Sequence, residues 1–177
     1  MKKLLLILSF SCIISLSVDI IGPKYRIESS LGAISVKEKY IFRSYKFFSN
    51  SVSLLPEWRA KINQKFDITF GPKITLNFAF NLDNIKTPTI RPSLILGGEV
   101  DFNYKIKDNI KMYTGIEVGT GIGFQVPVIT GDLHLQGPEF TSISKIALGV
   151  KINDKYNFAF YTGAIKGLIG IEAGYIF

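Results

Sequence analysis

Large apolar residues alternate with small or polar residues along most of the chain. Residues 66–80 place an apolar side chain at most alternate positions, and residues 94–106 and 110–124 repeat the pattern. A period of two residues is typical of a β-strand with one apolar face and differs from the 3.6-residue period of an amphipathic helix. Hydrophobic residues make up 47% of the sequence, yet no run of about 20 apolar residues suits a membrane-spanning helix. The sequence therefore predicts an all-β fold.

A weak internal repeat divides the alternating segments into strands. The pattern Lys-Ile, a tight polar turn and a large apolar residue occurs at residues 61–66, 105–110 and 151–156. Asn and Asp in these turns tolerate the left-handed backbone of short hairpins. Longer, less regular connections separate the hairpins at 35–51, 81–89, 127–138 and 163–167. We therefore expect eight strands with both chain ends on the short-turn side, approximately 24–34, 52–62, 66–80, 90–106, 110–126, 140–152, 156–162 and 168–177.

The alternating pattern does not by itself say which face points inward. A soluble lipocalin-like barrel places the apolar face inside, whereas an outer-membrane barrel turns it toward lipid. Eight strands carry roughly forty apolar-face residues, many of them large, and the interior of an eight-stranded barrel is too narrow to hold them. The other face carries Gly, Ser, Thr, Asn and charges of both signs. We therefore predict an antiparallel up-and-down transmembrane β-barrel with its apolar face outward.

Aromatic residues on the apolar face support a membrane-spanning barrel. One set lies close to the short turns or the chain ends: Tyr25, Phe66, Tyr104, Tyr156 and Tyr175. A second set lies toward the long connections: Phe80, Phe124 and Phe140. Aromatic belts of this kind mark the two interfaces of a membrane barrel.

Two segments fit the eight-strand scheme less well. Gly71-Pro72 falls inside the third strand, where proline cannot donate to the ladder, so we expect a bulge or a kink there. Residues 39–48 contain enough Tyr and Phe either to extend the first hairpin beyond the membrane or to form strands of their own. A ten-stranded barrel is therefore the alternative.

The N-terminus has the features of an export signal. Lys2 and Lys3 precede an apolar run at residues 4–18, and Ser15 and Ser17 are the small residues that a signal peptidase recognises. We expect a cleaved Sec-type signal peptide at residues 1–17 and a barrel at residues 18–177, with an uncleaved anchor helix as the alternative.

Cys12 is the only cysteine, and Ser9 replaces the aliphatic residue of a lipoprotein signal. Cleavage after Ser17 leaves no thiol, which excludes disulfides, zinc–thiolate sites and cysteine nucleophiles in the mature chain.

The inward face of the expected barrel carries charges of both signs: Arg26, Glu28, Glu57, Arg59, Lys73, Glu99, Asp101, Glu117, Lys145 and Glu172. Burying such charges without partners is very unfavourable, and the mixed signs offer partners. We predict a structural ionic network that plugs the lumen, with contacts between Glu99, Glu117 or Glu172 and Arg59, Lys73 or Lys145. A proton or ion path, and so a narrow passive pore, is the alternative.

The C-terminal residues alternate in the same way and end on an aromatic residue: Ile169, Ile171, Ala173, Tyr175 and Phe177. In this motif and in its architecture the mature chain resembles the small outer-membrane β-barrels of Gram-negative bacteria, the OmpA and OmpX type. The resemblance implies location in the outer membrane, contact with lipopolysaccharide, and presentation of Ile171, Tyr175 and Phe177 to the barrel-assembly machinery. It implies little about activity.

Some eight-stranded barrels of this class are lipid A deacylases or palmitoyl transferases, which use a histidine with a serine. His134 is the only histidine, and Gln136 stands where the deacylases have serine. No spacing singles out Ser142 or Ser144 as a nucleophile beside a general base. We therefore expect no enzyme, cofactor or metal site, and a deacylase- or acyltransferase-like enzyme is the alternative.

The first long connection is basic and aromatic. Its candidate surface-contact residues are Tyr40, Phe42, Arg43, Tyr45 and Phe47. They could contact lipopolysaccharide or a host surface molecule. The net charge of +7 includes Lys2 and Lys3, which leave with the expected signal peptide, so the basic excess of the mature chain is modest. Nucleic-acid binding needs a soluble basic face, which the barrel topology does not leave. We expect a monomeric barrel with a structural or surface-interaction role, in adhesion or membrane integrity.

Overall fold

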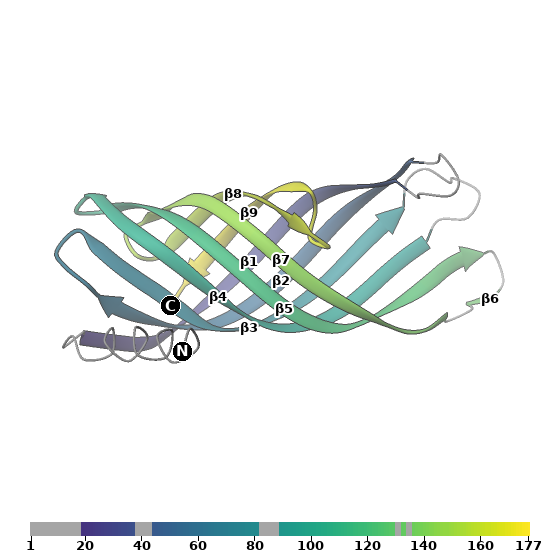
Figure 1. Cartoon of the computed structure of the whole chain (residues 1–177), viewed down its shortest axis with the longest axis horizontal. Helices are drawn as coiled ribbons and strands as arrows, with labels where there is room; N and C mark the ends of the chain where they lie inside the picture. The colour runs from purple at the N-terminus through teal and green to yellow at the C-terminus, as the bar shows by residue number, and fades with distance from the viewer. Residues whose placement is uncertain (1–18, 38–43, 82–88, 130–131, 134–135) are drawn as a thin grey trace, which may run out of the picture.

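The structure, a computed structural model, describes residues 19–37, 44–81, 89–129, 132–133 and 136–177. Eight long antiparallel strands form a closed ring in which each pairs with the next along the chain and the last pairs with the first (Figure 1). The long strands are β1 (Asp19–Lys37), β2 (Ser44–Lys61), β3 (Phe66–Asn81), β4 (Thr89–Lys107), β5 (Ile110–Ile129), β7 (Gln136–Ile152), β8 (Tyr156–Ala164) and β9 (Ile169–Ile176). The two-residue β6 (Asp132–Leu133) pairs with the end of β5. Within the described residues, no helix is long and apolar enough to cross a bilayer.

The ring confirms the eight-strand prediction, and the ten-strand alternative is wrong. β1 continues to Lys37 and β2 begins at Ser44, so the described part of the aromatic segment, residues 44–48, lengthens the first hairpin. The connection expected at 35–51 is therefore shorter than predicted. The connection expected at 127–138 is shorter as well, because β5 runs to Ile129 and β7 begins at Gln136.

The two faces of the strands have opposite character. Large apolar side chains such as Ile146 and Leu148 are 56% and 58% exposed on the outer face. The inward side chains are mostly polar or charged and buried, and Tyr113, Ala147 and Tyr161 belong to a small apolar cluster among them. The apolar surface is therefore on the outside, as the volume of the apolar residues predicts.

Gly71-Pro72 does not produce the expected bulge. The β3–β4 ladder runs through both residues without a shift, and on the other side Pro72 lies opposite Pro56. The β2–β3 register is the same on either side of this point, although the ladder is interrupted between the Leu54–Ile74 and Trp58–Phe70 pairs. A Cβ on Gly71 would lie 1.9 Å from the Pro56 carbonyl oxygen. Two opposed prolines thus interrupt one ladder locally, and a glycine permits their close approach.

Aromatic rings near the short turns contact one another in a cluster of four: Tyr25, Tyr156, Tyr175 and Phe177. Tyr25 stacks on Phe177 with ring centroids 5.9 Å apart, and Tyr175 contacts both Phe177 and Tyr156. Their exposure on the outer face suits the interface of a bilayer.

At the opposite end Phe80 and Phe140 are exposed on the outer face, whereas Phe124 is half-buried. A register shift between Gly123 and Gln125 accompanies this difference. Phe124 and Phe140 help to line a cavity of about 230 Å³ at the loop-side mouth, together with Asn77 and Ile165. Bulges commonly redirect a side chain in this way.

The ring is not equally tall on all sides. β8 and β9 have 9 and 8 residues, whereas the other long strands have 16 to 20. The β8–β9 hairpin therefore ends well before its neighbours (Figure 1). Its connecting loop turns back onto β1, where the Leu168 amide donates to the Ala33 carbonyl at 2.8 Å.

A charge on the outer face should destabilise the folded chain in lipid. We expect Ile146→Arg to lower the free energy of unfolding in vesicles by about 2–4 kcal/mol, because Ile146 lies midway along the lipid-facing band. Urea titration followed by fluorescence of Trp58, the single tryptophan, measures this loss. Gln64→Arg, in an exposed turn, is the matched control and should change stability by less than about 0.5 kcal/mol. Equal stability of both variants would place Ile146 in water.

Candidate functional site

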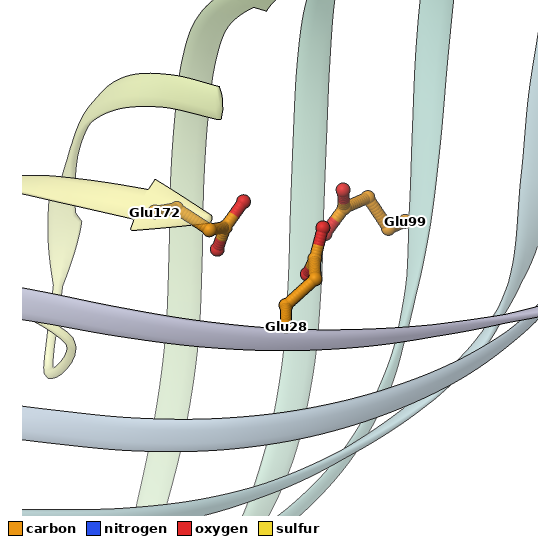
Figure 2. Close-up of side chains that lie close together, drawn as sticks. All are labelled: Glu28, Glu99 and Glu172. Carbon is orange, nitrogen blue, oxygen red and sulfur yellow. The ribbon is translucent and has the colours of Figure 1, made fainter. Parts of the chain in front are cut away.

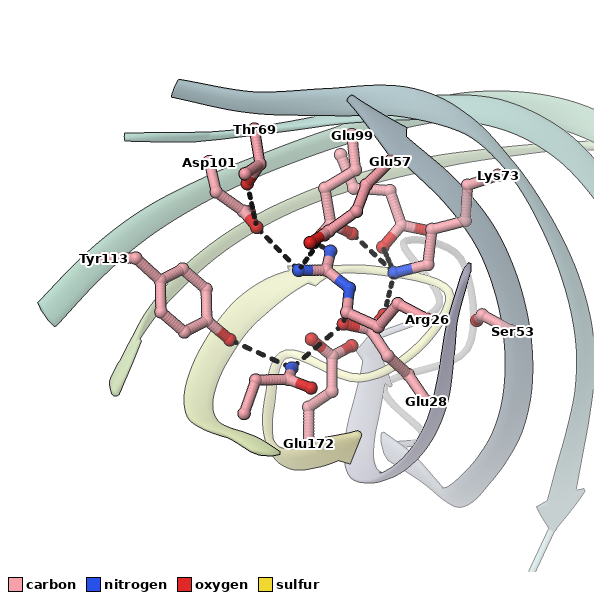
Figure 3. A network of polar contacts seen from close by, with 12 residues as sticks. Arg26, Glu28, Ser53, Glu57, Thr69, Lys73, Glu99, Asp101, Tyr113 and Glu172 are labelled. Carbon is pink, nitrogen blue, oxygen red and sulfur yellow. Dashed lines mark hydrogen bonds and ion pairs between the residues drawn. The ribbon is translucent and has the colours of Figure 1, made fainter. Parts of the chain in front are cut away.

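Arg26 of β1 lies at the centre of the lumen and is completely buried (Figure 3). Its guanidinium donates to Asp101 Oδ2 at 2.7 Å and to Glu99 Oε1 at 2.6 Å, both on β4. Glu28 and Glu57 lie within 3.0 and 3.2 Å of the same group. Arg26 is therefore the common partner of four carboxylates from three strands.

Two lysines continue the network toward the loop side. Lys73 of β3 bridges Glu28 and Glu99 and lies 3.2 Å from Glu117. Lys145 of β7 donates to Glu172 Oε2 at 2.8 Å and lies 3.0 Å from Glu117 and 3.2 Å from Glu99. These two ammonium groups tie β1, β3, β4, β5, β7 and β9 together through the lumen.

A third lysine, Lys151 of β7, extends the network toward the short turns. Its ammonium donates to Asp101 at 2.8 Å and to Thr69 at 2.9 Å. It also lies 5.1 Å from the centre of the Tyr113 ring, a distance suited to a cation–π contact. Asn157 of β8 donates to Glu28 at 3.0 Å. Each of the eight long strands thus contributes a side chain to the network.

The fourth lysine comes from the short β8–β9 loop. Lys166 is buried and its ammonium reaches Glu117 at 3.1 Å and Ser53 at 3.3 Å. Tyr161 donates its hydroxyl to the Lys166 carbonyl at 3.0 Å. Ile165 has a φ of 71° and Gly167 a φ of 143°, and a β-branched residue at positive φ is strained. The contacts of Lys166 hold this strained loop inside the lumen.

The buried charges nearly cancel. Among the described residues, seven carboxylates and five cations are buried, and every one of the seven carboxylates is within ion-pair distance of a cation. The carboxylates are Glu28, Glu57, Asp67, Glu99, Asp101, Glu117 and Glu172; the cations are Arg26, Lys73, Lys145, Lys151 and Lys166. Burial without such partners would be very unfavourable, so the pairing is a condition of the fold.

Glu28, Glu99 and Glu172 form the one carboxylate group among the described residues that is compact enough to consider for a metal ion (Figure 2). One oxygen from each lies within 4.8 Å of the others. Lys73 and Lys145 contact these same carboxylates, so their ammonium groups supply the positive charge that an ion would bring. The cluster is best explained as part of the ion-pair network.

A second, more open group of charges lies at the short-turn end of the lumen. Arg59 donates to Asp154 at 3.0 Å and lies 3.8 Å from Asp67, and Lys111 contacts both carboxylates at 2.8–2.9 Å. Arg59 therefore does not reach Glu99, Glu117 or Glu172, because it lies too close to the turns. Partial burial favours the neutral form of Asp154, but hydrogen bonds from Lys111 and Arg59 outweigh it and lower its pKa below the usual range.

The structure places most of the expected lumen residues together and adds others. Arg26, Lys73, Glu99, Asp101, Glu117, Lys145 and Glu172 converge in one network, while Arg59 lies apart from it. Lys151, Lys166 and Tyr113 are not among the residues predicted for this network. Lys151 lies an even number of residues from Lys145 on the same strand, and Tyr113 lies an even number from Glu117. This spacing places both side chains on the lumen face and could have been read from the sequence. Lys166 lies in a loop, where no period applies.

The remaining candidate residues are placed as follows. Ile171 and Tyr175 are exposed on the outer face, and Phe177 pairs through its backbone with Tyr25. Ser142 and Ser144 are exposed on the outside of β7. The backbones of Tyr45 and Phe47 pair with Val36 and Ile34. His134, Tyr40, Phe42 and Arg43 lie outside the described residues, as does the expected signal peptide.

Solved structures of outer-membrane proteins share this fold. The outer membrane enzyme PagL superposes with a TM-score of 0.52 at 11% identity, over 85% of this chain and 95% of that one. Neisserial surface protein A superposes with a TM-score of 0.50 at 12% identity, over 89% and 95% of the two chains. Protein-family models and curated protein sequences give no match. The chain therefore has the fold of the small eight-stranded outer-membrane β-barrels, a fold found here in an enzyme and in a surface protein.

Removing the central cation should destabilise the barrel strongly. We expect Arg26→Met to lower the free energy of unfolding by about 3–5 kcal/mol, because it leaves buried carboxylates without their shared partner. Arg59→Met, at the open end of the lumen, should cost no more than about 1 kcal/mol. Urea titration in detergent or vesicles measures both.

The double variant Arg26→Met/Asp101→Asn keeps this prediction testable if the single variant fails to fold. It should recover part of the loss, because it also removes one of the unpaired charges. A loss for Arg26→Met no larger than that for Arg59→Met would contradict the central role of Arg26.

Proposed function

We propose that the protein is an integral outer-membrane β-barrel with a closed lumen and a structural or surface-interaction role, in membrane integrity or adhesion. The observation that carries this proposal is the filled lumen. Arg26, Lys73 and Lys145 and their carboxylates occupy its middle, and Lys166 covers them from the loop side. Side chains held by several ion pairs each leave little room for a permanent aqueous path.

The outer surface supports membrane insertion as a single chain. Exposed apolar side chains encircle the barrel, and β9 pairs with β1 so that the described strands close into a ring, as a strand structure in lipid requires. Such a surface fits a bilayer with lipopolysaccharide in its outer leaflet. The expected export signal would direct the chain across the inner membrane toward this bilayer. We propose that Ile171, Tyr175 and Phe177 present the C-terminal strand to the barrel-assembly machinery, and that the inserted barrel is a monomer.

The long first hairpin is the proposed contact surface. β1 and β2 extend beyond the β8–β9 hairpin on the loop side (Figure 1). Tyr40, Phe42, Arg43, Tyr45 and Phe47 lie at or near the tip of this hairpin in the sequence. Aromatic and basic side chains in the connection between β1 and β2 suit contact with anionic lipopolysaccharide or a host surface ligand.

A strain lacking the protein separates this role from the pore and enzyme alternatives. We expect deletion to lower resistance to detergent, and the wild-type chain to restore it. A chain with Ser at all five positions, 40, 42, 43, 45 and 47, should restore detergent resistance but lose surface binding, because the barrel stays intact while the contact side chains are removed. Cell-surface binding and minimal inhibitory detergent concentration measure the two effects.

Uptake of small hydrophilic solutes and the masses of lipid A should be the same with and without the protein. A protein-dependent change in solute uptake would instead support a narrow pore. A protein-dependent loss or gain of an acyl chain on lipid A would support a deacylase or acyltransferase, and either result would contradict the proposal.

A further inference from the structure

The rim of the barrel at the short turns is rich in lysines that the lumen does not use. Lys24, Lys61, Lys65, Lys107 and Lys155 are exposed there, and Lys105 is partly exposed. Asp19 and Asp108 are the exposed acidic side chains on the same rim within the described residues. The rim therefore carries an excess of positive charge, in contrast to the balanced lumen above it.

Three of these lysines line one cleft between the β2–β3 and β4–β5 turns. The cleft has a volume of about 590 Å³, and Lys65, Lys105 and Lys107 border it together with Ile106 and Asp108. The Lys105 amide donates to the Lys65 carbonyl at 2.7 Å, which fixes the two turns side by side. A register shift between Lys105 and Lys107 marks a bulge at Ile106, and both flanking lysines border the same cleft.

The charge of the cleft is only partly compensated. Asp108 pairs with Lys105 at 2.8 Å, and this contact lowers the pKa of the Asp108 carboxyl. Among the described residues, no ion pair involves Lys65 or Lys107. At the lumen mouth next to the cleft, by contrast, Arg59 and Lys111 are matched by Asp67 and Asp154. Two ammonium groups therefore remain available to an anion.

The cleft also adjoins the lipid-facing surface. Ile106, on its border, is 50% exposed, and Tyr104, two residues closer to the middle of the barrel, is 52% exposed. Tyr104 lies in the aromatic belt, and such belts lie at the level of lipid headgroups. A ligand that fits both features has an anionic group for the lysines and an apolar part for Ile106 and Tyr104.

We propose that this cleft binds the phosphodiester headgroup of an anionic phospholipid. Lys65 and Lys107 would contact the phosphate oxygens, and the acyl chains would lie along the outer face beside Tyr104. Because short turns face the periplasm in barrels of this class, the ligand would come from the inner leaflet of the outer membrane. The lysines then anchor the barrel at a fixed depth and orientation.

Native mass spectrometry of the refolded chain in detergent tests the proposal, with phosphatidylglycerol and phosphatidylcholine as probes. The wild-type chain should retain phosphatidylglycerol in preference to phosphatidylcholine. Lys65→Gln/Lys107→Gln should weaken phosphatidylglycerol binding about 30-fold, because each lysine near a lipid surface contributes appreciably. Lys24→Gln/Lys155→Gln removes the same charge elsewhere on the rim and should weaken it by less than about threefold.

Equal retention of the two lipids by the wild-type chain would overturn the proposal. An equal loss in both double variants would also overturn it, because diffuse charge and not the cleft would then bind the lipid. Displacement of the lipid by excess inorganic phosphate would show that the site takes free phosphate and would refute the lipid assignment. The gel-mobility shift on boiling, which should be the same for all chains, controls for folding.

Discussion

Mutual neutralisation of charges inside a ring surrounded by lipid is the constraint on which the rest of this structure depends. Arg26 is surrounded by Glu28, Glu57, Glu99 and Asp101, and no other side of the barrel could accept these groups. A slip of one residue in any strand would turn its lumen side chains toward hydrocarbon. Because all eight long strands contribute to the network, its ion pairs and side-chain hydrogen bonds specify the register of the whole ring and exclude alternatives that backbone hydrogen bonds alone would tolerate.

The same constraint explains the asymmetry between the two ends. At the loop side the short β8–β9 hairpin leaves the lumen open to one flank, and its loop turns inward so that Lys166 reaches Glu117. The strained backbone at Ile165 persists because the ion pair and the Tyr161 hydrogen bond hold it. At the turn side Arg59 and Lys111 balance Asp67 and Asp154, and among the described residues no ion pair involves Lys65 or Lys107 of the rim.

Sequence reasoning predicts the strands and their faces well, because both depend on the pleat of the backbone. It predicts the ion-pair partners of the lumen charges poorly, because these depend on side-chain length and on how far each residue lies from the turns. Arg59 lies at a lumen-facing position of the alternating pattern, but it is too close to the turn to reach Glu99. Pro72 suggested a bulge, yet it lies opposite Pro56, where one local interruption serves both residues. Lys166 could not be predicted, since a loop has no period and only the fold brings it to Glu117.

Measuring the membrane depth of side chains on the outer face tests most directly the claim that the apolar face of the barrel contacts lipid. Cys12 is the only cysteine in the sequence, so single cysteines at Met112, Val118 and Ile171 can carry nitroxide labels once Cys12 is absent. These labels should collide frequently with oxygen and rarely with a water-soluble nickel chelate in vesicles, because their side chains face lipid. Frequent collision with the nickel chelate at all three positions would contradict the account, since the apolar face would then not be in the membrane.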